Sequence, residues 1–405
     1  MPIKLQAGNK HHIDDYKGFP PLDSKFLRLN SHNYLLVTTF KVSGDARTHS
    51  LHCYRLNDDF SLKDSSPRLI CEVEHIRSFR EIKTPWGAGI IMADHGVDVA
   101  PFRGSKPKLL IEKEGELVDF SDKLNVKTAF YFDAIPVHNP RTSSDDIVLT
   151  VFPSTWSQPT LLSFQDGLYR EFPENLPVNW RNNQFAFMTG VDLSDKIAPG
   201  GQIMLGICDS LTPNLDHNLL MSCNNEKWQF NEKVLLPKIQ KKLGWGTVYA
   251  ACGKQNNQQK GWHVVQLNHN HGYSDAVVQV LFIDEKFQIT EEKVSGYPVG
   301  LSQTAFYFHK TIFFDIDGDG ENEILITTRE IKKWDYENWG SDLLVLKRDD
   351  AGIWNFQSLF FQEKQFTCIE NVDSVFNPET GVDSLLVKYF SNQFYVVNFK
   401  RLAGS

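Results

Sequence analysis

The densest group of chemically versatile side chains is the acidic stretch that runs from Asp315 to Glu323. It reads Asp-Ile-Asp-Gly-Asp-Gly-Glu-Asn-Glu, so carboxylates alternate with other residues and glycines lie between them. Calcium takes about six to eight hard oxygen ligands in a flexible geometry, and glycines permit the tight turns that bring alternate side chains inward. We therefore predict one structural calcium ion (Ca2+), bound by Asp315, Asp317, Asp319, Glu321 (through its carbonyl) and Glu323.

This acidic loop differs from an EF-hand. An EF-hand needs a glutamate at its twelfth position and a helix on each side, whereas the twelfth position here is Ile326. The flanking runs 311–314 and 324–328 read as strands. The alternative is a solvated turn without an ion, but the crowded acidic groups would then repel one another.

A second polar group follows an apolar run that ends at Ala93. Asp94 and His95 are adjacent, and Arg103 comes shortly after them. A histidine or a carboxylate near the reacting proton can serve in general acid–base catalysis. If the protein is an enzyme, we predict Asp94, His95 and Arg103 as its catalytic residues; the alternative is a polar loop. The sequence contains no nucleophile elbow, P-loop or dinucleotide-binding signature.

Aromatic residues in polar stretches form the third group. Their rings can stack on the apolar face of a sugar while neighbouring polar side chains hydrogen-bond its hydroxyls. The predicted ligand-binding set is Trp86, Asp98, Trp156, His269, His271, Tyr273, Trp334 and Trp339. Two alternatives stay open: the rings pack between structural units, and the two histidines lie in a solvated turn, since no third metal ligand is evident beside them.

The elements that position these residues are short β-runs that repeat about every 50 to 60 residues, as in repeat architectures. The run Thr128–Phe132 leads to Asp146–Thr150, and the identical run Thr304–Phe308 leads to Glu323–Thr327 at nearly the same separation. A third and a fourth run follow in each unit. Helical periodicity is scarce, with one short helix expected over 236–243.

Units of four strands that repeat radially are the blades of a propeller. We predict an all-β chain that forms a single seven-bladed β-propeller over residues 1–405, with four-stranded antiparallel blades. The blades start near residues 26, 78, 127, 184, 244, 304 and 366. The last unit shows three clear strands, so we expect an N-terminal strand near Ile3–Gln6 to close the ring and remove the open sheet edge. Stacked sandwiches, or six or eight blades, are the alternatives.

The acidic loop with its flanking strands resembles the FG-GAP/VCBS repeats of integrin-α-like propellers. The segment Ala93–Gly104 is also similar to a stretch between strands two and three in some VCBS-repeat proteins. The resemblance implies that the acidic loop joins the first two strands of a blade and binds calcium. Ligands would then lie on the opposite face. The family includes lectins of about this length.

Net charge and hydrophobicity exclude some classes of binding partner. The formal net charge is −8 and no Lys/Arg-rich stripe occurs, which argues against nucleic acid. The sequence contains no apolar run of about 18 residues, so we do not expect it to insert into a membrane. The N-terminus lacks the apolar region of a signal peptide. We expect a cytoplasmic protein or one exported by a route not visible in the sequence, and free thiols at the six cysteines. The sequence gives no indication of oligomeric state.

These observations lead to one main functional hypothesis and two alternatives. The main hypothesis is a calcium-stabilised recognition module that binds a glycan or other small polar ligand on the face opposite the acidic loop. The first alternative is an enzyme, a lyase or hydrolase that acts on a saccharide at one composite central site. The second is a protein-interaction platform. The loops differ between repeats, which favours one composite site over several equivalent ones.

Overall fold

The computed structural model describes residues 10–12, 23–43, 46–97, 102–142, 144–151, 158–181, 187–194, 202–208, 219–235, 247–256, 261–268, 277–296, 306–316, 319–330, 343–359, 369–389 and 393–397. Within these ranges the chain is almost entirely β-structure. The helical elements are η1 (Ser121–Lys123), η2 (Pro173–Asn175) and α1 (Val178–Arg181). The helix expected over 236–243 lies outside the described residues. None of the described helices is long and apolar enough to cross a membrane.

In the part of the chain that the structure describes, the strands form seven sheets of four or five strands each. The first sheet contains β2 (Asp23–Leu29), β3 (His32–Ser43), β4 (Ala46–Leu56) and β5 (Arg68–Val73). The second contains β6 (Ile76–Thr84), β7 (Gly87–Asp94), β8 (Lys108–Lys113) and β9 (Glu116–Asp119). The third contains β10 (Leu124–Asn125), β11 (Tyr131–His138), β12 (Asp145–Val151), β13 (Thr160–Gln165) and β14 (Leu168–Glu171). The fourth contains β15 (Phe187–Asp192), β16 (Gln202–Cys208), β17 (Leu219–Asn224) and β18 (Lys227–Leu235).

The remaining three sheets follow the same order along the chain. The fifth contains β19 (Thr247–Asn256), β20 (Gly261–Asn268), β21 (Val277–Asp284) and β22 (Ile289–Glu292). The sixth contains β23 (Val294–Ser295), β24 (Phe306–Phe314), β25 (Glu323–Glu330), β26 (Leu343–Arg348) and β27 (Trp354–Leu359). The seventh contains β28 (Ile369–Asn377), β29 (Val382–Tyr389), β30 (Gln393–Val397) and β1 (Lys10–His12).

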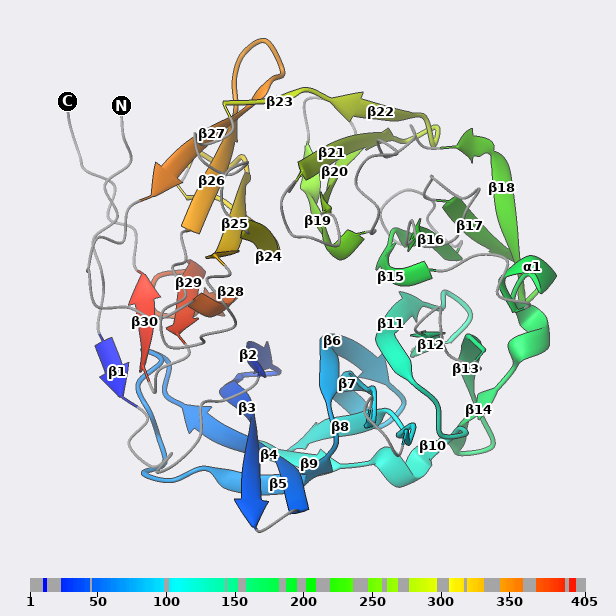
Figure 1. Ribbon diagram of the computed structural model, residues 1–405, viewed down its shortest axis with the longest axis vertical. Coiled ribbons are helices and arrows are strands. Elements are labelled where there is room, and N and C mark those ends of the chain that lie inside the picture. Colours follow the sequence, from blue (N-terminus) through cyan, green and yellow to red (C-terminus); the bar gives the residue numbers. More distant parts are fainter. Residues whose placement is uncertain are drawn as a thin grey trace.

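The sheets are arranged around a common centre, with the first long strand of each sheet innermost (Figure 1). Consecutive strands pair antiparallel, whereas β10 and β23 add to the outer strands β14 and β27 in parallel. The predicted repeat starts agree with the first long strand of each sheet; the largest offset is residue 127 against Tyr131 of β11. The predicted all-β, propeller-type architecture is therefore confirmed.

The core lies between the sheets. Among the described residues, seven hydrophobic clusters each join two neighbouring sheets. Strands buried on both faces become almost continuously apolar, and all of β12 is buried. One cluster joins the first sheet to the seventh, where the rings of Phe26 and Phe394 have centroids 5.1 Å apart. Packing of side chains from sequence-distant sheets thus holds the two ends of the chain's repeats together.

The N-terminal strand completes the last sheet. β1 pairs antiparallel with β30, and Lys10 lies opposite Tyr395. The segment that pairs is Lys10–His12, further along the chain than the predicted Ile3–Gln6, which lies outside the described residues. The register of the fourth sheet keeps Cys208 and Cys223 apart. Cys223 lies opposite Gln202, the first residue of β16, whereas Cys208 is the last residue of that strand. Cys223 carries a free thiol, as do Cys53 and Cys71.

Candidate functional site

A cavity of about 190 Å³ lies among the innermost strands of six sheets. Its polar lining residues are Asp23, Ser24, Lys25, Arg77, Ser78, Arg80, Asp133, Thr189, Lys310, Thr311, Asn371 and Asp373. They come from β2, β6, β11, β15, β24 and β28. The radial arrangement makes this convergence unavoidable, because every sheet points its first strand at the centre. We call this space the central cavity.

Three of the contributing sheets are linked by a lysine network, made of Lys25, Lys310, Asp23, Asn371 and Asp373. Lys310 Nζ lies 2.8 Å from Asp23 Oδ1 and 3.0 Å from Asn371 Oδ1. Lys25 Nζ lies 2.5 Å from Asp373 Oδ1, and Asn371 donates a short hydrogen bond to the same carboxylate. The network thus joins the first, sixth and seventh sheets at the cavity wall.

The other three contributing sheets are linked by an arginine network, made of Arg80, Asp133 and Thr189. Arg80 Nη2 lies 2.7 Å from Asp133 Oδ2 and 3.0 Å from Thr189 Oγ1. The Thr189 hydroxyl donates to Asp133 over 2.6 Å. Asp133 is only 2% exposed, so its charge is stabilised by these partners rather than by water. Each network thus pairs cationic groups with carboxylates on its own part of the cavity wall.

Two hydroxyls of the cavity lining have no hydrogen-bond partner among the described residues. Ser24 is fully buried and Thr311 nearly so, yet neither Ser24 Oγ nor Thr311 Oγ1 makes a hydrogen bond. A buried polar group without a partner costs about 1–3 kcal/mol, and native proteins rarely leave one unsatisfied. These hydroxyls therefore indicate a place where a polar ligand or water completes the wall.

Glu81 lies next to Arg80 on β6 and belongs electrostatically to the same region. Its side chain is accessible to solvent, although protein atoms surround it on most sides. Burial raises the pKa of Glu81; the charge of Lys25 opposes this shift and that of Asp373 reinforces it. An acid whose pKa is raised keeps its proton closer to neutral pH and can donate it.

The predicted catalytic residues lie elsewhere, in the loop that follows β7. Asp94 is fully buried and accepts hydrogen bonds from the backbone N–H groups of Glu74 (3.0 Å), His75 (2.8 Å) and Gly96 (3.2 Å). It also accepts one from Ser105 Oγ at 3.0 Å. A carboxylate held by several backbone donors orders the loops around it. The carboxylate of Asp94 is thus committed to backbone contacts.

His95 and Arg103 have separate surroundings. His95 is 3% exposed, and its Nδ1 lies 3.1 Å from the carbonyl oxygen of Tyr131. The side chain of Arg103 is largely exposed and forms a short ion pair with Glu74. The three predicted residues share one loop and none of them lines the central cavity, so their catalytic role stays a prediction.

Trp86 lies on the face where we did not expect it. It was predicted beside the ligand, opposite the acidic loop, yet it sits in the turn between β6 and β7. That turn joins the first two strands of its sheet, as the acidic loop does in the sixth, so the repeated topology places both on one face. Its ring packs against Phe120, Phe164 and Tyr169 at centroid distances of 5.3–6.0 Å. The packing alternative therefore applies to Trp86.

The acidic loop joins β24 to β25, as predicted. Glu323 is buried; its Oε2 accepts the N–H of Ile316 at 2.8 Å, and its Oε1 lies 3.2 Å from Lys347 Nζ. The same ammonium lies 3.3 Å from Asp319 Oδ2. Asp315 Oδ2 accepts the N–H of Gly320 at 2.9 Å. The carboxylates thus gather around one turn, together with a lysine that the sequence had not linked to them.

The structure describes only part of the predicted calcium site. Asp317 lies outside the described residues, and Glu321 is exposed. Within the described ranges, no group of three or more His, Cys, Asp or Glu side chains is placed to hold a metal ion. Most of the predicted ligand-binding set also falls outside those ranges: Asp98, Trp156, His269, His271, Tyr273, Trp334 and Trp339.

The residues of the central cavity were not singled out from the sequence as a site. A signal was present, because charged residues such as Lys310 and Asp133 interrupt otherwise apolar or aromatic first strands. Charged residues are rarely buried unless they are paired. Their partners, however, belong to other repeats, and only the ring arrangement brings these together.

Known proteins resemble this chain in fold but not in sequence. No family model and no curated protein matches the chain. Among solved structures, a protein from Lactobacillus plantarum has 10% identity and a TM-score of 0.54, over 88% of this chain and 89% of its own. An exotype rhamnogalacturonan lyase has 10% identity and a TM-score of 0.46, over 98% of this chain and 75% of its own. A family-43 β-1,3-galactosidase, solved with galactodeoxynojirimycin, has 9% identity and a TM-score of 0.44, over 88% and 99%.

These similarities concern the fold alone. The identities are near 10%, and the two enzymes have TM-scores below 0.5. Unrelated functions share the same folds, so a site has to be argued from its own side chains. By fold, the chain is similar to multi-bladed β-propeller proteins.

Proposed function

We propose that this protein is a saccharide-active enzyme whose single composite site is the central cavity. The observation that carries the proposal is the convergence of two charged networks and two unpartnered buried hydroxyls on one cavity. This is the geometry expected for the enzyme alternative, in which one asymmetric site forms at the centre. It does not resemble a set of equivalent pockets, one in each repeat.

A saccharide fits the chemistry of the cavity wall. Sugars present many hydroxyls that both donate and accept hydrogen bonds, and the wall offers carboxylates, an amide, hydroxyls and cationic groups. Apolar surface for the face of a sugar ring comes from Phe79, Phe132, Ile312 and Val372. The cavity is smaller than the roughly 300–1,000 Å³ typical of sites for drug-sized ligands. We therefore expect it to hold about one sugar unit of the substrate.

We assign proton transfer to Glu81, which follows the cavity-lining residue Arg80 on β6 but does not itself line the cavity. Glycoside hydrolysis requires one protonated carboxyl that protonates the leaving oxygen and one ionised carboxylate that assists on the other side of the ring. Glu81, whose pKa is raised by burial, is suited to the first role, and Asp373 lies close enough to influence its charge. The cavity lining has one more cationic side chain (Lys25, Arg77, Arg80 and Lys310) than carboxylates (Asp23, Asp133 and Asp373). This surplus favours a substrate with acidic groups, for which β-elimination is the competing reaction.

The test is a panel of neutral and acidic oligosaccharides, assayed for new reducing ends and for unsaturated products. The wild-type protein should turn over at least one of them. Glu81→Gln should lower kcat by about 100-fold or more, the usual contribution of a positioned catalytic group. Asp133→Asn, which removes the carboxylate that positions Arg80 and Thr189 at the cavity wall, should lower kcat as well. Lys286→Met, at an exposed position in the fifth sheet, is the matched control and should be unchanged.

Two results would overturn this assignment. Saccharide binding without turnover, unaffected by Asp133→Asn, would favour the recognition module on a face of the ring. Turnover that survives Asp133→Asn and Glu81→Gln but is lost in His95→Ala would return the chemistry to the loop after β7.

We also propose that the acidic loop binds calcium, with Lys347 as a competing cation. Carboxylate oxygens are the ligands that calcium prefers, and Lys347 lies on two of the predicted ligands, Asp319 and Glu323. Millimolar calcium should raise the melting temperature of the wild type. Lys347→Met should show the same rise at a lower calcium concentration, because the competing cation is removed. If calcium shifts neither melting temperature, the ion is not part of this protein.

A further inference from the structure

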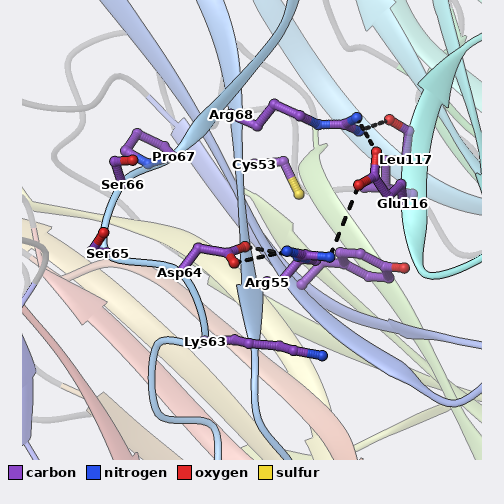
Figure 2. Close-up of a pocket in the computed structure, with 11 residues that line it drawn as sticks. Cys53, Arg55, Lys63, Asp64, Ser65, Ser66, Pro67, Arg68, Glu116 and Leu117 are labelled. Carbon is purple, nitrogen blue, oxygen red and sulfur yellow. Dashed lines mark hydrogen bonds and ion pairs between the residues drawn. The ribbon is translucent and has the colours of Figure 1, made fainter.

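A second cavity, of about 590 Å³, lies between the first and second sheets. Figure 2 shows the residues that line it. It is lined from β3, β4, the β4–β5 connection, β5 and β9. The strand register explains its composition. Tyr34 lies opposite Arg55 across β3 and β4, and Cys53 lies opposite Arg68 across β4 and β5. These four side chains therefore share the face that looks toward the second sheet. We call this space the lateral pocket.

The lateral pocket contains one more cation than its carboxylates can neutralise. Arg55 holds Asp64 through two hydrogen bonds of 2.8 Å, from Nε and Nη2. Arg68 Nη1 lies 2.5 Å from Glu116 Oε2. Lys63 forms no ion pair with any residue that the structure describes. Its ammonium is therefore the surplus charge.

The unpaired lysine is held in place by its backbone. The N–H of Lys63 donates to the carbonyl oxygen of Arg55 at 2.9 Å, so the two cationic residues lie side by side on one hairpin. Two backbone hydrogen bonds of Asn57 fix the turn before Lys63. The Asn57 N–H donates to the carbonyl oxygen of Ser61 at 2.9 Å, and the Asn57 carbonyl oxygen accepts the N–H of Phe60 at 2.9 Å. Figure 2 shows the side chains of Arg55, Lys63 and Arg68 extending to the same side of the strand.

Hydrogen-bond donors remain available around that charge. Arg55 Nη1 is 3.9 Å from Glu116, too far for a hydrogen bond. The hydroxyl of Tyr34 is fully buried, lines the pocket, and has no partner among the described residues. Burial raises the pKa of Tyr34, so the phenol keeps its proton and acts as a donor. The carboxylates of Asp64 and Glu116 are already engaged by the arginines, which leaves the pocket rich in donors and short of acceptors.

We propose that the lateral pocket binds a small molecule through an oxyanion, a carboxylate or a phosphate, held by Lys63, Arg55 and the Tyr34 hydroxyl. Arginine and lysine together with a hydroxyl are the usual recognition set for such groups. The volume lies within the range of small-molecule sites, roughly 300–1,000 Å³, so the ligand is larger than a bare ion. Thiol chemistry has no part in it, because burial raises the pKa of Cys53 to about 12.

The test measures binding by titration calorimetry at low salt. The probes are glucuronate for a carboxylate, glycerol phosphate for a phosphate ester, inorganic phosphate, and glucose as the neutral control. We expect saturable binding of glucuronate or glycerol phosphate, which also tells the two anion sources apart, and no binding of glucose. Lys63→Glu should weaken binding at least about 10-fold and Tyr34→Phe about 3-fold or more, as expected for a charged and a neutral donor.

Controls keep the result separate from folding and from the central cavity. Lys63 is exposed and Tyr34→Phe removes only an unpartnered hydroxyl, so both variants should fold. Lys286→Glu is the matched charge reversal outside the pocket, and Asp133→Asn alters only the central cavity; both should bind the anion as the wild type does. Absence of saturable binding for every anion, or binding that Lys63→Glu leaves unchanged, would overturn the proposal.

Discussion

Two buried aspartates, Asp94 in the loop after β7 and Asp133 on β11, show what distinguishes a carboxylate that orders the backbone from one that builds a site. Both are almost fully buried. Asp94 is held mainly by backbone N–H groups of two connecting segments. Asp133 accepts one backbone N–H, that of Ala134, and is otherwise held by the side chains of Arg80 and Thr189, which come from two other sheets. Beside Asp133 lies a cavity with unpartnered hydroxyls, whereas the described contacts of Asp94 leave it fully occupied.

The difference teaches that burial of a charge does not by itself identify a functional residue. A carboxylate satisfied by backbone donors stabilises a local conformation, and its removal leaves several N–H groups without acceptors. A carboxylate that positions side chains around open space can exchange partners when a ligand arrives. The comparison therefore predicts opposite balances between stability and activity at the two positions.

The largest effect on stability is expected at Asp94. Asp94→Ala leaves three backbone N–H donors and a serine hydroxyl without their acceptor, which should cost about 3 kcal/mol or more of the free energy of unfolding. Chemical denaturation measures this. Turnover per folded molecule should be retained; its loss in a variant of normal stability would make Asp94 catalytic and break the comparison.

A smaller loss of stability and a large loss of ligand binding are expected at Lys310. Lys310→Met leaves Asp23 without its partner in a mostly buried position, at a cost of about 2 kcal/mol. Saccharide binding should weaken by about 10-fold or more. Calorimetry and denaturation on one preparation give both numbers, with Lys286→Met as the control. A change in stability alone would mean that the lysine network only joins sheets.

Glu292 tests a third arrangement, a carboxylate held by side chains away from the central cavity. Burial acts to raise the pKa of Glu292, but hydrogen bonds from His263, Arg348 and Trp354 lower it to about 2 from its ordinary 4.5. The stability that this carboxylate adds is present above pH 4.5 and is lost as the pH falls toward 2. Glu292→Gln should therefore cost about 1–2 kcal/mol near neutral pH.

The pH dependence of Glu292→Gln provides the check. The free energy of unfolding of the wild type should fall more steeply than that of the variant between pH 4.5 and pH 2. Parallel curves for the two proteins across this window would show that the carboxylate is not held as the structure indicates.

The smallest effect on stability is expected at Glu81. Folding raises the pKa of this acid, so its contribution to stability declines as pH rises from the unfolded toward the folded pKa. Glu81→Gln should leave stability within about 0.5 kcal/mol of the wild type, or increase it slightly, at neutral pH. The pH profile of turnover should lose its alkaline limb. A profile unchanged in shape would assign the proton donor to another group.

Local pattern was sufficient to predict much of the fold. The spacing of the repeats located the first strand of every sheet, because alternation of apolar residues and turn signals are properties of neighbouring residues. The hairpin position of the acidic loop was predicted for the same reason. Trp86 was misplaced because the short turn that contains it joins the first two strands of its sheet, and its aromatic character is the same in a packed and in an exposed position.

By itself the sequence determined the strands, their repeat and the acidic turn, since each depends on residues close along the chain. Only the tertiary structure decided which polar residues meet. Lys310 and Asp23, or Lys63 and Tyr34, come together through sheet arrangement and register rather than sequence spacing. The reason is physical: the radial arrangement of the sheets brings strands from six of them to one cavity, and buried charges there are tolerated only beside partners, most of which other sheets supply.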